Sequence, residues 1–305
     1  MKTFAPDYYK SFKCIAHRCR RSCCIGWEIY VDDETLEKYN QLGGRYTDSL
    51  CETEDGVCFK LCEGERCPFL NERGLCDIII EKGESFISEI CREHPRFYSF
   101  FSDRTEVGLG LSCEEAARII IMQNGKTSLV PIEDDGFPED ELTAAEQYIL
   151  KKRGEIFDIL QDEEKPLSDR VTDTLTSVNA AFPQKSPAEW YKLFSDLEIM
   201  DESWRALLKG IEVSISKVCG LDKAFENLMI YFIYRHTSVA ADREDLGARV
   251  LFAIASCYII GGVFASQEIQ TPETLTDIAS RYSAEIEYSE ENTAKLINFF
   301  KLFLR

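Results

Sequence analysis

The feature that most constrains this chain is the crowding of cysteine near its N-terminus. Residues 14–24 read CIAHRCRRSCC and hold four cysteines in eleven positions. Eleven of the thirteen cysteines lie between Cys14 and Cys113, and only Cys219 and Cys257 lie beyond. Cysteines at this density form disulfide bonds, carry out redox chemistry or bind metals. The rest of the sequence distinguishes among these three roles.

The predicted compartment argues against disulfide bonds. The start, MKTFAPDYYKSFKC, lacks the apolar core of a signal peptide, so we expect a cytoplasmic protein. The longest apolar run, Val250–Ala265, is shorter than the roughly 20 residues that cross a bilayer, which favours a buried helix over a membrane segment. Cytosolic thiols stay reduced, and clustered cysteines there more often bind metals or act in catalysis.

The charge of the chain bears on its partners. The formal net charge is −19, whereas a nucleic-acid backbone attracts clustered lysine and arginine. We therefore expect no nucleic-acid partner, and the shortness of the apolar run leads us to expect no membrane. An acidic surface suits a basic protein or peptide, although solubility alone explains the charge equally well.

Composition divides the chain into three predicted parts. Residues 1–125 form a cysteine-rich metal-binding region built from short elements, which is typical of a fold held by metal instead of a large core. Residues 126–141 carry two prolines, a glycine and many acids, and are interpreted as a linker or loop. Residues 142–305 show helical periodicity throughout. The predicted fold class is mainly α, with a C-terminal helical bundle and a small irregular α+β metal-binding region.

Local signals locate the elements. Thr143 with Glu146 and Ser186 with Glu189 predict capping boxes at helix starts. Further helices are predicted over 202–218, 221–240, 243–265 and 272–305, the last as one or two helices. In the first region we expect strands over 26–31 and 56–62 and helices over 32–44, 83–95 and 114–125. No G-x-G-x-x-G follows a strand, and Gly108–Gly110 is too short for a nucleotide loop, so a doubly wound fold is not expected.

The cysteine spacing favours a thiolate metal site. Four residues separate Cys14 from Cys19 and three separate Cys19 from Cys23, within the range used for chelation. Thiolate-only sites select zinc or iron–sulfur clusters, and the chain has only three histidines to offer instead. In extended chain Cys23 and Cys24 would point to opposite faces. They would then serve different irons of a cluster or different metals, or one would not be a ligand.

Three stretches together resemble the flagellin lysine-N-methylase family: FKCIAHRCRRSCCIGWEIYVDDETLEKY, CPFLNERGLCDIIIEKGESFISEICREHPRFY and GLGLSCEEAARII. The resemblance covers roughly the first 120 residues well and the helical remainder loosely. In outline it extends to a broader group of bacterial cysteine-cluster proteins that chelate zinc or iron. Glu114 stands where the family pattern leads us to expect proline. The cysteines that match the motif, and that the resemblance assigns as metal ligands, are Cys14, Cys19, Cys23, Cys24, Cys67, Cys76, Cys91 and Cys113.

Five cysteines are left out of the predicted ligand set. Cys51, Cys58 and Cys62 lie in a stretch without a match to the family. Cys219 and Cys257 are interpreted as small buried hydrophobic residues within the helical part.

The resemblance implies transfer of a methyl group from S-adenosylmethionine to lysines of flagellin, or of another protein that presents lysines. It also implies an iron–sulfur cluster of the 4Fe-4S type, with zinc as the alternative metal. A lysine amine, with a pKa near 10.4, must lose its proton before it attacks the sulfonium methyl, so a site must desolvate it or supply a base. No catalytic base is predicted. The alternatives are a non-catalytic zinc- or cluster-binding interaction module and a redox protein.

Two further sets of residues are candidates for the site. Arg92 and Arg96 lie beside a motif cysteine and could bind the carboxylate of S-adenosylmethionine, with a structural ion pair as the alternative. Tyr234, Arg235 and His236 interrupt an apolar helix. Because buried polar groups need partners, these three either line a pocket or are satisfied within the core or at the surface.

Overall fold

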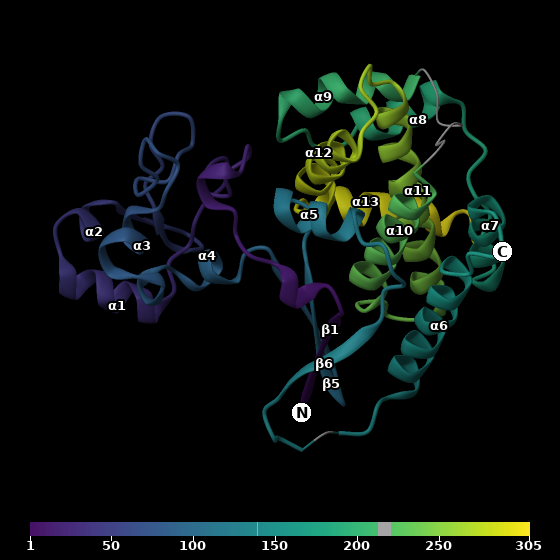
Figure 1. Ribbon diagram of the computed structural model, residues 1–305, viewed down its shortest axis with the longest axis horizontal. Coiled ribbons are helices and arrows are strands. Elements are labelled where there is room, and N and C mark those ends of the chain that lie inside the picture. Colours follow the sequence, from purple (N-terminus) through teal and green to yellow (C-terminus); the bar gives the residue numbers. More distant parts are fainter. Residues whose placement is uncertain (139, 213–220) are drawn as a thin grey trace. The chain divides into compact units, whose positions relative to one another are not determined.

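The computed structural model describes residues 1–138, 140–212 and 221–305 (Figure 1). These residues form two compact units. The helical unit comprises Met1–Phe12, Phe97–Ser112 and Ala116–Arg305, and the cysteine unit comprises Lys13–Arg96 and Cys113–Glu115. All eight predicted metal ligands therefore lie in one unit. The predicted domain boundaries at residues 125 and 142 stay predictions.

Helices dominate the structure, which confirms the predicted mainly α fold class. No doubly wound sheet occurs in the described part of the chain. Of the helix predicted over 202–218, residues 213–218 lie outside the described residues, as does Cys219. The helices from residue 114 onward are α5 (Glu114–Ile121), α6 (Ala144–Leu160), α7 (Leu167–Ser177), α8 (Pro187–Ser195), α9 (Glu202–Leu208), α10 (Asp222–Thr237), α11 (Arg243–Ala265), α12 (Pro272–Tyr282) and α13 (Glu290–Lys301), with a 3-10 turn at Lys209–Glu212 and a π-helical turn at Ser283–Glu287.

The centre of the helical unit is the pair α10 and α11. These two helices pack on each other, α6 contacts α10, and α12 and α13 contact α11 (Figure 1). Phe232 and Phe252 lie at this interface with no exposed surface and meet edge to face. Among the described helices, α11 alone is long and apolar enough to span a membrane, yet most of it is buried inside the unit. The interpretation of its apolar run as a core helix is confirmed.

Both predicted capping boxes are present. The Thr143 hydroxyl accepts a hydrogen bond from the Glu146 amide, while the Glu146 carboxylate accepts one from the Thr143 amide. Ser186 and Glu189 repeat the arrangement at the start of α8. These reciprocal bonds satisfy amides that have no partner within the helix.

A small sheet completes the helical unit and was not predicted. Its strand order is β4–β5–β1–β6, in which β1 runs parallel to β5 and antiparallel to β6. The stretch interpreted as a linker thus contains a strand that pairs with the N-terminus of the chain. Position 108 in this sheet requires glycine, because a Cβ there would collide with the Phe97 ring. The strands are β1 (Lys2–Pro6), β4 (Arg96–Phe101), β5 (Arg104–Leu109) and β6 (Leu129–Asp134).

The cysteine unit is built from short elements, as predicted. Asp32 caps α1 by accepting from the Thr35 amide at 3.0 Å, which confirms the predicted helix start. Its elements are α1 (Asp33–Leu42), α2 (Arg45–Asp48), the hairpin β2 (Leu50–Thr53) and β3 (Gly56–Phe59), α3 (Asp77–Lys82) and α4 (Glu89–Glu93), with 3-10 turns at Ala16–Arg18 and Glu84–Phe86. Its buried core consists of Ile29, Val31, Tyr39, Tyr46, Phe59, Cys67, Phe69, Ile78 and Ile87.

Two predictions for this unit are wrong: one strand is absent and one helix is divided. No strand forms over 26–31, where Gly26 adopts a φ of +89° and Tyr30 makes a single bridge with Cys58. The helix over 83–95 is split into a 3-10 turn and α4. The Asp32 carboxylate accepts a hydrogen bond from the Glu89 amide at 2.7 Å, so a new helix begins at Glu89 and ends before Pro95. The helix predicted over 114–125 ends at Ile121.

Candidate functional site

Four of the predicted ligands share one apolar environment. Cys67 is buried in the core of the cysteine unit, and the other three pack against that core. The Cys67 amide donates to the Cys24 carbonyl at 2.9 Å, and Leu70 forms an isolated bridge with Cys76. Backbone pairing therefore brings together cysteines that are far apart in the sequence. We call this set the core thiols: Cys24, Cys67, Cys76 and Cys91.

The core thiols are near enough to influence one another's charge. Burial raises the pKa of Cys67 to about 12, and the charges of Cys24, Cys91 and Cys76 add to this effect. Burial likewise raises the pKa of Cys91 to about 11, with contributions from Cys24 and Cys76. Neighbouring thiolates repel, so each makes ionisation of the next harder. A bound cation would reverse that effect and favour the deprotonated forms that bind metals.

The remaining four predicted ligands form a second set nearer the surface. Residues 113–115 belong to the cysteine unit although the chain on both sides belongs to the helical unit. The Arg20 amide and Nε donate to the two Glu114 carboxylate oxygens at 2.8 Å each, and the Cys19 Sγ lies 3.7 Å from Glu114 Oε2. Glu114, at the position where proline was expected, therefore ties Cys113 to the Cys19 loop. We call this set the surface thiols: Cys14, Cys19, Cys23 and Cys113.

Local structure places the other surface thiols beside these two. The 3-10 turn Ala16–Arg18 joins Cys14 to Cys19, and the Ala16 amide donates to the Cys14 Sγ at 3.4 Å. A hydrogen bond to Cys24 raises the pKa of Cys23, and the charges of Cys14 and Cys113 act in the same direction. Cys23 thus lies near the first and last members of the set.

The adjacent pair Cys23 and Cys24 is where the two sets meet. The expectation of an extended chain is wrong here, because the Ile25 amide donates to the Ser22 carbonyl at 3.2 Å and closes a turn around both cysteines. The turn brings their thiols into hydrogen-bond contact. The Cys23 thiol donates to Cys24, and this bond lowers the pKa of Cys24 against the opposing effect of burial. Cys24 is thereby favoured as a thiolate, the form in which cysteine binds metals.

The donor chemistry fits a metal centre, although the thiols do not form a closed cage. Within the described residues, no three or more Cys, His, Asp or Glu side chains are arranged closely enough to hold a metal ion. An all-thiol set is nevertheless the one that zinc and iron–sulfur clusters select. Ligand geometry is commonly completed by the metal itself, because binding is coupled to folding and to loss of the thiol protons. The assignment of the eight ligands stays a prediction.

The other cysteines occupy different settings. Cys51 and Cys58 face each other across the β2–β3 hairpin with their sulfur atoms 3.2 Å apart, and Cys62 is exposed. Cys257 is buried in α11, and burial raises its pKa well above the usual value. The interpretation of Cys257 as a buried hydrophobic residue is confirmed.

Arg92 lies in the last turn of α4, and Arg96 is the first residue of β4. The Arg96 Nη1 donates to the Arg92 carbonyl at 3.0 Å and to the Glu93 carbonyl at 3.5 Å. A guanidinium at this position satisfies carbonyls that have no helical partner and complements the negative helix end. This contact favours a structural role for Arg96. The binding of S-adenosylmethionine by Arg92 and Arg96 stays a prediction.

The second candidate set is satisfied inside the helical unit. His236 Nε2 lies 2.7 Å and Arg235 Nε 3.3 Å from Glu287 Oε1, while the Tyr234 hydroxyl donates to the Val107 carbonyl at 3.1 Å. Burial alone would raise the pKa of Glu287, but the Arg235 charge and the His236 hydrogen bond outweigh it and lower the pKa. The polar side chains on α10 are therefore balanced by an anion. Sequence reasoning missed Glu287 because it lies on the π-helical turn, remote in sequence.

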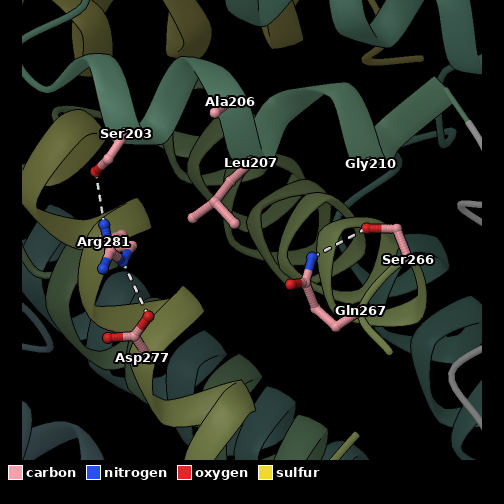
Figure 2. Close-up of a pocket in the computed structure, with 8 residues that line it drawn as sticks. All are labelled: Ser203, Ala206, Leu207, Gly210, Ser266, Gln267, Asp277 and Arg281. Atoms are coloured by element: carbon pink, nitrogen blue, oxygen red, sulfur yellow. Dashed lines mark hydrogen bonds and ion pairs between the residues drawn. The ribbon is translucent and has the colours of Figure 1, made fainter. Parts of the chain in front are cut away.

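A pocket opens among the described residues of the helical unit, and no sequence pattern indicated it. Its volume is about 390 Å³, within the range of small-molecule sites. Figure 2 shows Arg281 between Asp277 and Ser203, donating to the carboxylate at 2.9 Å and to the hydroxyl at 2.6 Å. Gln267 and Ser266 form the opposite wall. The charged residues of this lining satisfy each other, so the pocket presents mainly hydroxyl, amide and apolar groups.

Part of this chain matches a known protein family. Residues 202–302 match the model of the FliB lysine N-methylase C-terminal domain. The predicted resemblance to the flagellin lysine-N-methylase family is confirmed. The pocket and the Glu287 cluster lie inside the matched residues, whereas the cysteine unit lies outside them.

The names of individual relatives agree with this family match. Lysine-N-methylases of Salmonella typhimurium and Salmonella choleraesuis are each 26% identical over an alignment of 128 residues, and the match covers 38% of this chain and 31% of theirs. The flagellar biosynthetic protein FliU of Salmonella muenchen is 24% identical over 128 residues, or 75% of its length. The match thus spans about a third of the two lysine-N-methylases. No solved structure is similar.

Proposed function

We propose that this chain is a cytoplasmic protein-lysine N-methyltransferase that transfers methyl groups from S-adenosylmethionine to flagellin. The observation that carries the proposal is the match of residues 202–302 to the FliB lysine N-methylase C-terminal domain. The relatives named lysine-N-methylase support the same activity, and FliU supports a flagellar substrate. The net charge of −19 suits a substrate segment that presents lysines.

The proposed metal centre is an iron–sulfur cluster of the 4Fe-4S type, bound by thiolates of the cysteine unit. Support comes from the donor set, because all eight motif cysteines lie in one compact unit while histidine is scarce. Zinc is the alternative metal. The transfer itself is a polar displacement, so the protein must present the substrate lysine as a neutral amine. Desolvation of the amine lowers its pKa and supplies part of that requirement.

Co-expression with flagellin tests the activity. Mass spectrometry of flagellin should show lysines that have gained the mass of one or more methyl groups only when the chain is present. The Cys23→Ala variant should lose the modification, whereas Cys62→Ala, which removes an exposed thiol outside both sets, should retain it. Unmodified flagellin in the presence of folded, metal-loaded protein would contradict the proposal. Full methylation by Cys23→Ala would show that the thiol centre is dispensable for transfer.

The second candidate function is a non-catalytic zinc- or cluster-binding interaction module. The small core of the cysteine unit favours it, because a metal would then serve only to hold short elements together. Calorimetric titration with S-adenosylmethionine separates the two functions, since a structural module has no reason to bind the donor.

The same titration tests the predicted donor contacts. We expect Arg92→Gln and Arg96→Gln each to weaken donor binding about tenfold, as loss of one charge-assisted contact would. Lys82→Gln, which removes an exposed charge from the end of α3, is the matched control. Unchanged binding in both arginine variants would assign Arg92 and Arg96 to structure alone.

A further inference from the structure

The motif cysteines number eight, twice what one centre needs. A structural zinc ion takes four protein ligands, and a 4Fe-4S cluster takes four thiolates. A single centre would therefore leave four motif cysteines without a role. The structure divides the eight into two sets of four, the core thiols and the surface thiols defined above.

We propose that the cysteine unit holds two separate metal centres, one on the core thiols and one on the surface thiols, which adjoin at Cys23 and Cys24. The inference rests on the thiolate centre of the proposed function and specifies its number and ligands. Each centre would take a zinc ion or an iron–sulfur cluster, because both are bound by four thiolates.

Backbone geometry carries the assignment of the core centre. The Cys67 amide binds the Cys24 carbonyl, the Leu70 amide binds the Cys67 carbonyl at 3.0 Å, and Leu70 bridges to Cys76. Cys91 reaches the same apolar core from α4. Four segments thus each place one thiol in or against the same apolar core, and four thiolates are what a structural zinc site or a 4Fe-4S cluster takes.

A different anchor carries the assignment of the surface centre. Only three residues after Arg96, residues 113–115, belong to the cysteine unit. The Arg20 backbone amide and the Arg20 Nε both donate to the Glu114 carboxylate and hold Glu114 there. That anchor delivers Cys113 to the loop that carries Cys14 and Cys19. The short segment Cys113–Glu115 would place a metal ligand in the cysteine unit if Cys113 binds the metal.

The turn at Ser22–Ile25 explains how adjacent cysteines can serve both centres. The Ile25 amide donates to the Ser22 carbonyl at 3.2 Å and closes a turn around Cys23 and Cys24. Cys24 packs against the apolar core, whereas Cys23 is exposed. The pair therefore divides between a buried and an accessible environment.

Metal analysis of single variants tests the inference without reference to methyl transfer. The full chain is purified without oxygen, and iron, zinc and acid-labile sulfide are measured per chain, with circular dichroism to verify folding. Cys19→Ser and Cys76→Ser should each lose the metal of one centre and keep that of the other, which is about half of the wild-type metal when both centres hold the same kind. The double variant Cys14→Ser/Cys19→Ser should retain the same half, whereas Cys19→Ser/Cys76→Ser should lose nearly all metal. Cys62→Ser is the matched control and should lose none.

Several outcomes would overturn the inference. The folded Cys19→Ser variant could lose all of its metal or none of it. The wild-type protein could also contain no metal. If Cys76→Ser fails to fold, Cys19→Ser still decides, because its cysteine is outside the apolar core. A second measurement is the time course of metal removal by a chelator from the wild type. Two phases of similar amplitude are expected, with only the slow phase left in Cys19→Ser, while a single phase would contradict two centres.

These results are separable from those on the proposed function. Two centres in a protein that leaves flagellin unmodified would refute the methyltransferase alone. One centre in an active methyltransferase would refute the present inference alone.

Discussion

The two compact units differ in what can stabilise them. The helical unit surrounds α10 and α11 with other helices and buries large apolar side chains completely. The cysteine unit has helices of ten residues or fewer and nine buried core residues, one of which is Cys67. Apolar burial grows with the size of a unit, so the larger one can be stable through packing alone while the smaller needs additional links. The predictions below test that contrast.

Metal removal should have the largest effect and should act on one unit only. Binding of a structural metal contributes about 10–16 kcal/mol to small thiolate domains, so the stripped cysteine unit should unfold. Hydrogen exchange of the full chain, followed by mass spectrometry, should show lost protection in Lys13–Arg96 and unchanged protection in α10 and α11. Equal protection of both units before and after chelation would remove the distinction between them.

Loss of a buried ion pair should destabilise the helical unit and leave metal content unchanged. Arg153 contacts both carboxylate oxygens of Glu106 at 2.7 and 2.6 Å, and both side chains are almost fully buried. Arg153→Ala leaves a buried charge without its partner and should lower the free energy of unfolding by about 3–5 kcal/mol.

Denaturant titration with metal analysis measures this effect, and the double variant Glu106→Leu/Arg153→Leu is its control. Replacing both charges by apolar groups should recover most of the loss, since no isolated charge remains. A double variant as unstable as Arg153→Ala would show that the loss comes from packing instead of an unpaired charge.

The capping box of α6 should have a smaller effect that depends on pH. The Glu146 carboxylate accepts from the amides and hydroxyls of Thr143 and Ser102, and these bonds outweigh burial and lower its pKa to about 2. Glu146→Gln should cost about 1 kcal/mol at neutral pH. A carboxyl with a depressed pKa stabilises the fold above its ordinary pKa of 4.5, and the benefit is lost as pH falls toward 2.

Comparison with Glu189→Gln sharpens this prediction. Glu189 makes the same box at α8 but has no partner like Ser102 among its hydrogen bonds, so its replacement should cost less. Thermal unfolding at pH 7 and at pH 3 gives both values. A Glu146 effect that persists unchanged at low pH would contradict the role of the ionised carboxylate.

An exposed ion pair should have the smallest effect. Lys295 and Glu291 are one helical turn apart on α13, and about half or more of each side chain is exposed. Lys295→Ala should change the free energy of unfolding by about 0.3–0.5 kcal/mol, because solvent screens such pairs. A loss as large as that of Arg153→Ala would mean that burial does not separate the two cases.

Much of the fold could be predicted because its signals are local. A capping box such as Thr143 with Glu146 involves residues three apart, so its hydrogen bonds are legible in the sequence. The α11 run is apolar on all sides, which already indicates a core helix. The strand predicted over 26–31 is absent: Gly26, its first residue, adopts a φ of +89°, and within the stretch only Tyr30 forms a bridge. The sheet was missed because β1 pairs with strands about 100 or more residues away.

The sequence by itself determined the types and approximate positions of the helices, the presence of a thiol-rich region and the family that the chain resembles. Periodicity, caps and cysteine spacing are properties of neighbouring residues, so no tertiary structure is needed to see them. Only the tertiary structure decided which thiols gather with which, that Cys113 returns to the cysteine unit, and that Glu287 balances the charges on α10. Those relations join residues distant in the chain, whose proximity depends on packing of the whole fold and is written in no local pattern.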